Sequence, residues 1–107
     1  MRELFTAFWI VIFSVTASFA SDISALELLI IEYAAKHQDT AYEYFLLQIE
    51  SGATPEEQAV YLYGMGRVNE SKGNVSEAIN DYMAAEILGN ESASRALIRL
   101  RKNNKED

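Results

Sequence analysis

Few side chains in this 107-residue chain could do acid–base, nucleophilic or metal chemistry. His37 is the only histidine, and cysteine is absent. Because His37 stands near the predicted end of a helix, a solvated cation beside the helix dipole explains it better than a metal ligand or a general base. Glu56 and Glu57 are adjacent carboxylates, but the first turn of a helix favours acidic residues in any case. We therefore expect no enzyme activity, no cofactor and no metal.

Three motifs of the form Asn-X-Ser could accept a glycan in a eukaryotic secretory pathway. Asparagine and serine are also preferred at turns and helix starts. We favour this structural interpretation, because no other feature marks such a pathway. The motifs begin at Asn69, Asn74 and Asn90.

The first 20 residues have the pattern of a secretory signal peptide. A short charged start precedes a nearly unbroken apolar run over residues 4–15, and Ser18 and Ala20 are small. We expect cleavage after Ala20 and a periplasmic or secreted protein. The alternative is an uncleaved anchor, since residues 4–20 reach the short edge of a membrane-spanning helix. The mass of the chain from native cells distinguishes the two.

Charge is unevenly distributed along the chain, whose formal net charge is −7. Residues 21–94 hold 13 acids against three cations, whereas residues 95–107 hold five cations against two acids. Nucleic-acid binding needs clustered cations, so the acidic body argues against it. The basic end could contact an anionic lipid surface. Stabilisation of a helix C-terminus is the simpler explanation.

Apolar residues recur at helical spacing from Ser21 onward, and no stretch alternates with the period of a strand. The clearest helix start is Thr54-Pro55-Glu56-Glu57, where threonine caps, proline takes the first position and Glu57 completes a capping box. From Asn103 onward we expect a frayed, charged tail. The predicted helices run from Ser21-Asp22 to His37-Gln38, from Asp39 or Thr40 to Ser51-Gly52, from Pro55 to about Lys72, from Asn74 or Ser76 to Leu88-Gly89, and from Asn90-Glu91-Ser92 to residue 102.

The sequence repeats itself weakly after 37 residues. The aligned positions hold the small, aromatic and turn residues that a helix hairpin needs, which predicts two hairpins and a closing helix. The aligned pairs are Leu28 with Met65, Ala41 with Ala78, Phe45 with Tyr82, Gly52 with Gly89, and Ala59 with Ala96.

The second hairpin contains a set of small, large and turn residues at regular spacing: Leu62, Met65-Gly66, Gly73, Ala78, Tyr82 and Ala85. With this spacing it resembles a tetratricopeptide repeat over residues 59–90. In that family a large residue and Leu-Gly line the first helix, glycine marks the turn, and alanine, an aromatic residue and alanine line the second helix. Asn69 and Asn90 depart from the pattern, because they stand where the family has an aromatic residue and often a proline. The spacing is also similar to that of Sel1-like repeats, so both families stay open.

The resemblance implies a scaffold that binds a protein or peptide partner on the concave surface formed by the first helix of each hairpin. Leu26, Ile30 and Leu97 are explained as well or better by a place in the core. Arg67 is equally open to an intramolecular pair with Glu70. The residues expected to line the surface are Tyr63, Arg67 and Glu70 on the third helix, Leu26, Ile30 and Tyr33 on the first, and Leu97 and Arg101 on the last.

These patterns together predict an all-α fold, a short antiparallel helix-hairpin solenoid of about two repeats plus a capping helix, within residues 21–102. We expect an exported protein–protein interaction module. The alternative is a membrane-tethered structural subunit of an envelope or secretion complex. With so few repeats, exposed apolar ends such as Ile23, Ile31 and Leu100 could pair between copies, so we also expect that a homo-oligomer is possible.

Overall fold

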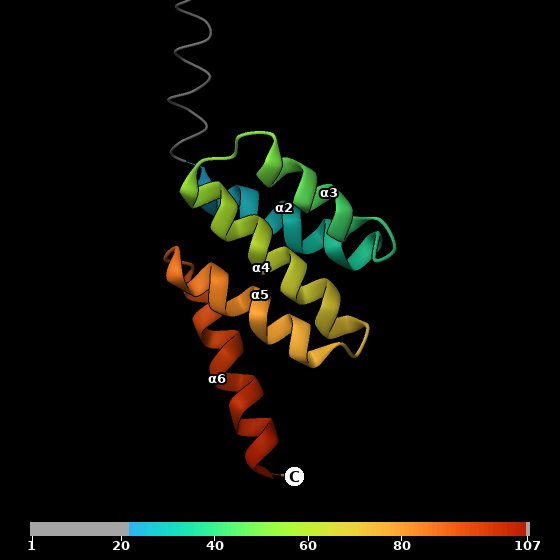
Figure 1. Cartoon of the computed structure of the whole chain (residues 1–107), viewed down its shortest axis with the longest axis vertical. Coiled ribbons are helices and arrows are strands. Elements are labelled where there is room, and N and C mark those ends of the chain that lie inside the picture. The colour runs from blue at the N-terminus through green and yellow to red at the C-terminus, as the bar shows by residue number, and fades with distance from the viewer. Residues whose placement is uncertain (1–21, 107) are drawn as a thin grey trace, which may run out of the picture.

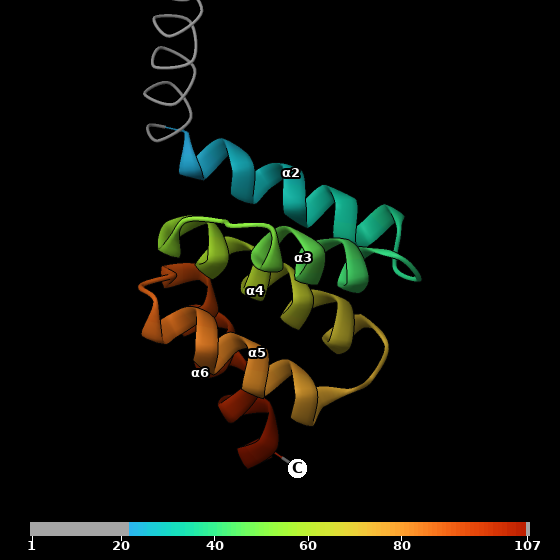
Figure 2. The same ribbon diagram turned by 45° about the horizontal axis from the view of Figure 1, so that its top comes forward.

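A computed structural model describes residues 22–106 of the chain. These residues form five α-helices and no strand, and consecutive helices run in roughly opposite directions (Figures 1 and 2), so the predicted all-α fold is confirmed. None of these five helices is long and apolar enough to cross a bilayer. The predicted signal peptide lies outside the described residues. The helices are α2 (Ile23–Lys36), α3 (Ala41–Glu50), α4 (Pro55–Ser71), α5 (Val75–Ile87) and α6 (Glu91–Glu106).

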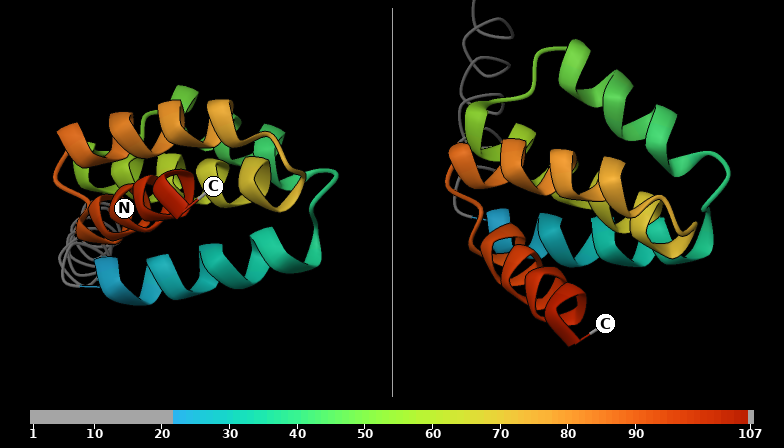
Figure 3. Two further views of the ribbon diagram at one scale, coloured as in Figure 1. Left: turned by 90° about the horizontal axis from the view of Figure 1, so that it is seen from below. Right: turned by 60° about the horizontal axis from the view of Figure 1, so that its bottom comes forward.

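Helix α4 is the centre of the fold. It packs extensively against α2, α3 and α5, whereas the backbones of α2 and α3 come close to each other in only a few places. Viewed from below, α4 lies between α2 and α5 (Figure 3, left). Helix α6 packs on α5, and its start reaches α2 because Asn90 and Ser92 both donate hydrogen bonds to the carboxylate of Glu27. The second hairpin, α4 and α5, is thus covered by α2 from the N-terminal side of the sequence and by α6 from the C-terminal side.

The caps predicted for α4 and α6 are present. At the start of α4, Thr54 Oγ1 accepts from the backbone N–H of Glu57 at 3.2 Å, and Glu57 Oε1 accepts from the backbone N–H of Thr54 at 2.8 Å. This is the predicted capping box, with Pro55 at the first helical position. Asn90 Oδ1 accepts from the backbone N–H of Ala93 at 2.8 Å, which satisfies an amide at the start of α6.

Helices α3 and α5 end alike, as the alignment of Gly52 with Gly89 predicts. Gly52 and Gly89 follow these helices with φ of 107° and 96°, a conformation that glycine adopts without strain. The C-terminal end differs from the prediction, because α6 continues through residues 103–106 instead of fraying at Asn103. Its acidic first residue and its basic later residues suit the helix dipole and favour this extension.

The buried residues form two clusters on either side of α4. Four of the five aligned pairs play matching roles, and Ala41, Ala78, Phe45 and Tyr82 are all fully buried. The first cluster contains Ile30, Ala34, Ala41, Phe45, Val60, Tyr61, Met65 and Val68, and the second contains Tyr63, Ala78, Tyr82, Ala85, Ala93, Ala96, Leu97 and Leu100.

The alignment of Leu28 with Met65 predicts similar surroundings for the two residues, and Ile23, Ile31 and Leu100 are expected to be exposed; both expectations are wrong. Leu28 is 69% exposed although its aligned partner Met65 is 3% exposed, because Met65 packs against the first hairpin and no helix precedes α2 in the described residues. Leu100 is buried, and Ile23 and Ile31 are half-buried against the two clusters. These three residues therefore do not form exposed apolar ends.

Two glycines let neighbouring helices approach the backbone of α4 closely. A Cβ atom on Gly66 would lie 2.6 Å from Cδ1 of Tyr82 on α5. One on Gly64 would lie 2.8 Å from Cε2 of Phe45 on α3 and would also meet Ile30 on α2. Separations this short are well inside van der Waals contact, so any side chain at either position would push the helices apart.

Candidate functional site

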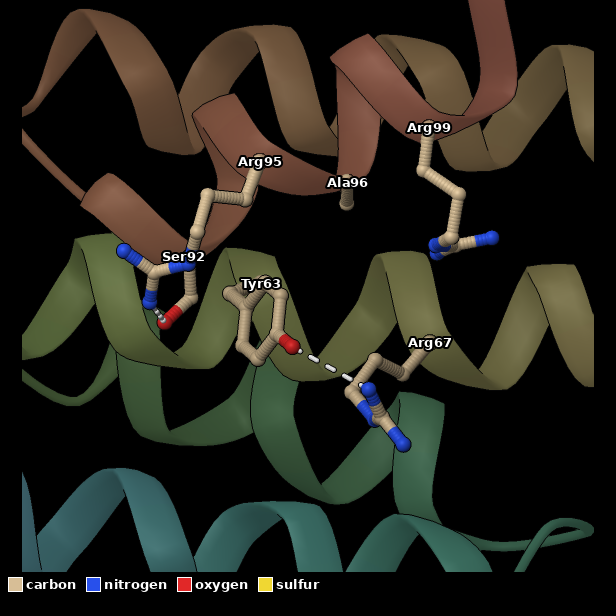
Figure 4. A pocket seen from close by; sticks show the side chains of 6 residues that line it. All are labelled: Tyr63, Arg67, Ser92, Arg95, Ala96 and Arg99. Atoms are coloured by element: carbon tan, nitrogen blue, oxygen red, sulfur yellow. Dashed lines mark hydrogen bonds between the residues drawn. The ribbon is translucent and has the colours of Figure 1, made fainter. Parts of the chain in front are cut away.

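An open hollow of about 250 Å³ lies between α4 and α6. The guanidinium groups of Arg95 on one side and of Arg67 and Arg99 on the other flank the ring of Tyr63 (Figure 4). Three arginines around one tyrosine make this a cationic site in an acidic chain. Its lining residues are Tyr63, Arg67, Ser92, Arg95, Ala96 and Arg99.

Tyr63 and Arg67 are positioned by α4, where residues four apart lie on one face. Tyr63 is only 6% exposed, because its ring packs in the second cluster near Tyr82 at 5.7 Å between ring centroids. Arg67 Nη1 donates to the Tyr63 hydroxyl at 3.1 Å, and its Cζ lies 5.8 Å from the centre of the Tyr63 ring. The buried ring thus supports a guanidinium that remains exposed to solvent.

Glu70 is held by two other residues. Arg99 donates to both of its carboxylate oxygens, at 2.5 Å to Oε2 and 2.9 Å to Oε1, and the Tyr82 hydroxyl donates to Oε1 at 2.8 Å. The hydrogen bonds from Arg99 lower the pKa of Glu70. The pKa of Tyr82 is raised, mainly by burial and in addition by its hydrogen bond to Glu70. The ion pair of Glu70 is therefore with Arg99, and Arg67 bonds the Tyr63 hydroxyl instead.

Arg95 points across the start of α6. Its Nη2 donates to Ser92 Oγ at 2.9 Å, and Ser92 Oγ in turn donates to Glu27 Oε2 at 2.9 Å. Within residues 22–106, neither Arg67 nor Arg95 forms an ion pair with a carboxylate. The hollow therefore presents two guanidinium groups that form no ion pair with an acidic side chain of residues 22–106.

The structure brings only part of the predicted surface together. Tyr63 and Arg67 line the hollow, and Glu70 lines a second, adjoining hollow of about 360 Å³ with Arg67 and Arg99. The other predicted residues lie elsewhere. Ile30 and Leu97 are core residues, Leu26 packs against the first cluster, Tyr33 stacks on Tyr44 with its ring centroid 4.9 Å away, and Arg101 is exposed outside the lining of the hollow.

Sequence reasoning missed Arg95 and Arg99. They are four residues apart and so share a face of α6, and Ser92 extends that face by one turn. This spacing was visible in the sequence. Their charge was instead assigned to stabilising the end of the helix, and only the packing of α6 beside α4 shows that they face Tyr63.

Two of the three Asn-X-Ser asparagines have structural roles. Asn69 is 9% exposed and donates to Asp81 at 2.8 Å, while Asn90 is 9% exposed and bonds Glu27 and the start of α6. Asn74 is exposed in the turn between α4 and α5. The structural interpretation of these motifs thus fits Asn69 and Asn90.

Among residues 22–106, no three histidine, aspartate or glutamate side chains come together in a way that could hold a metal ion. His37 lies against the ring of Tyr33, with 4.7 Å between ring centroids. Comparisons with protein families, with curated proteins and with solved structures find no match to this chain. The hollow between α4 and α6 is therefore the feature that bears most directly on function.

Proposed function

We propose that this chain is an exported protein-interaction module that binds an acidic segment of a partner in the hollow between α4 and α6. The observation that carries the proposal is the pair of guanidinium groups, Arg67 and Arg95, that face this hollow without a carboxylate partner. In a chain with a net charge of −7, most cations could be neutralised by nearby acids. An external acidic group would satisfy both arginines.

The residue types suit this role. Arginine forms bidentate hydrogen bonds with carboxylates, and tyrosine and arginine are over-represented among the residues that dominate binding energy at interfaces. Tyr63 is fixed by the core, so it loses little conformational freedom when a partner binds. A local cationic patch on an otherwise acidic surface also favours one orientation of an acidic partner over others.

The resemblance to tetratricopeptide and Sel1-like repeats supports the same proposal. Such repeats bind partners on the surface formed by their first helices. In this chain α4 and α6 correspond to first helices, and together they supply all the residues that line the hollow. The signal-like start of the sequence supports a place in the periplasm or outside the cell.

Affinity capture from envelope or secretion fractions tests the proposal. The bait is the chain that cells accumulate, compared with the double variant Arg67→Glu, Arg95→Glu. Both positions are exposed, so the variant should remain helical by circular dichroism. A matched control, Arg101→Glu with Lys102→Glu, makes the same change in net charge outside the hollow.

We expect the wild type and the control to capture the same partner, and the hollow variant to lose it about tenfold or more, because like charges face each other across the interface. Equal capture by the two variants would overturn the assignment of the hollow. A partner without an acidic segment would overturn its proposed chemistry.

A further inference from the structure

Helix α3 exposes a row of residues with acids at both ends. Glu43, Leu46, Leu47 and Glu50 are all exposed, the two leucines by 40% and 56%. Leu47 lies about 200° around the helix from the fully buried Phe45, so this acidic stripe points away from the core. Within residues 22–106, neither Glu43 nor Glu50 forms an ion pair. The acidic stripe is therefore apolar in the middle and negative at its two ends.

Helix α6 exposes a row with the opposite charge and the same spacing. Arg95, Ile98 and Lys102 are exposed, with Ile98 at 55%. Ile98 lies two residues from the buried Ala96 and two from the buried Leu100, so this basic stripe also points away from the core. Its two cations are seven positions apart in the sequence, and so are the two acids of α3.

The two stripes do not meet within one chain, because α3 and α6 are not packing partners in the described residues. Helices α3 and α6 lie on opposite sides of α4 and α5 (Figure 1). Other exposed apolar residues lack this complementarity. Met83 and Ile87 on α5 are exposed by 50% and 83%, but their neighbour Glu86 is a single acid.

We propose that the acidic stripe of α3 docks on the basic stripe of α6 in a second copy of this chain. The leucines would cover Ile98, and each glutamate would face a cation at the matching end of the stripe. The contact joins two different surfaces, so copies associate head to tail and can extend into a ring or a chain of copies. Arg95 belongs both to this basic stripe and to the lining of the hollow, whereas Ile98 and Lys102 lie outside the hollow, so the test changes only these two residues of α6.

The contact covers about two helical turns on each side, which is small compared with stable protein interfaces. We therefore expect weak association that increases with protein concentration. Because exposed charges contribute to it, added salt should weaken it. Glu43 and Glu50 also lie on the surface, so reversing their charge should change association far more than folding.

Sedimentation equilibrium of the chain in the form that cells accumulate tests this inference. One variant reverses the acidic stripe (Glu43→Lys, Glu50→Lys), and the other disrupts the basic stripe (Ile98→Glu, Lys102→Glu). Residues 98 and 102 are outside the hollow, so this second variant leaves partner binding intact. Circular dichroism checks that both variants remain helical, and Lys102→Glu alone is a milder substitute.

We expect the wild type to self-associate, each variant alone to be monomeric, and an equimolar mixture of the two variants to associate again. The mixture recovers because each variant still carries one intact stripe that fits the intact stripe of the other. A monomeric wild type at all concentrations, a variant that associates as strongly as the wild type, or a mixture that stays monomeric would each overturn the inference.

Discussion

The two hairpins share aligned alanine and aromatic residues, yet the second is tightly packed and the first is splayed. Ala41 and Phe45 on α3 are as fully buried as Ala78 and Tyr82 on α5. Nevertheless the backbones of α4 and α5 approach each other closely, while those of α2 and α3 approach in few places and meet through side chains, with Tyr33 against Tyr44 and Phe45. The difference lies on the first helix of each hairpin, not on the second.

The glycine at position 66 explains the difference. Gly66 lies against the Tyr82 ring, but 37 residues earlier the first hairpin has Leu29, which is 63% exposed. The side chain of Leu29 would occupy the space that an aromatic ring needs to pack against the backbone of α2 at this position. Phe45 therefore packs on the other side, against Gly64 of α4. The first hairpin is held together mainly through α4, and the second by direct contact.

The largest effect should come from removing the aromatic ring that the second hairpin encloses. Tyr82→Ala should reduce the free energy of unfolding by about 3–5 kcal/mol, because the ring is fully buried and its loss leaves a cavity. Urea unfolding followed by circular dichroism measures this. A loss below about 1 kcal/mol would mean that the close packing of α4 on α5 contributes little.

A smaller effect is expected from adding a methyl group at the glycine. Gly66→Ala should cost about 1–3 kcal/mol through overpacking against Tyr82, partly offset by the better helix propensity of alanine. The matched change in the first hairpin, Leu29→Ala, should stay within about 0.5 kcal/mol. Similar losses at both positions would contradict the explanation given for the splayed hairpin.

The hydroxyl of Tyr82 should contribute less than its ring. Tyr82→Phe removes the hydrogen bond to Glu70 but leaves the carboxylate with Arg99, so we expect a loss of about 1 kcal/mol. The first hairpin already has phenylalanine at the aligned position. A gain in the free energy of unfolding of Tyr82→Phe would show that the hydrogen bond from the Tyr82 hydroxyl to Glu70 does not stabilise the fold.

The weakest expected effect is the pH dependence due to Glu70. The pKa of Glu70 is lowered in the folded chain from the ordinary value of 4.5. Its contribution to the free energy of unfolding is therefore fully present above pH 4.5 and is lost as the pH falls through its pKa in the folded chain. Glu70→Gln should therefore lose less stability on acidification than the wild type. Urea unfolding at neutral and acidic pH checks this, and parallel losses would contradict it.

Much of the fold was predictable because its signals are local. The capping box at Thr54, the turn glycines and the alanine and aromatic positions each depend on residues a few positions apart. The exposure of Leu28 was not predictable in this way. It depends on which side of α2 receives α4, and a shift of 37 residues assumes that both hairpins face their neighbours alike.

The site was only partly predictable for the same reason. Tyr63 and Arg67 were identified because they lie on one helix and belong to residue types that bind partners. Arg95 and Arg99 join them only through the packing of α6 beside α4, while Tyr33 and Leu97 are drawn into aromatic and core contacts. Charge spacing within α6 showed which residues share a face, but not which helix that face meets.

The most direct test of the account is an NMR titration of the chain with an acidic peptide, an acetylated segment of glutamate and glycine residues, which lacks the leucines proposed to cover Ile98. Because NMR detects weak binding, the natural partner need not be known. We predict salt-sensitive shifts concentrated at Tyr63 and at the side chains of Arg67, Arg95 and Arg99. The shifts should disappear in the Arg67→Glu, Arg95→Glu variant. Shifts equally large at Arg101, or none at the hollow, would contradict the proposal.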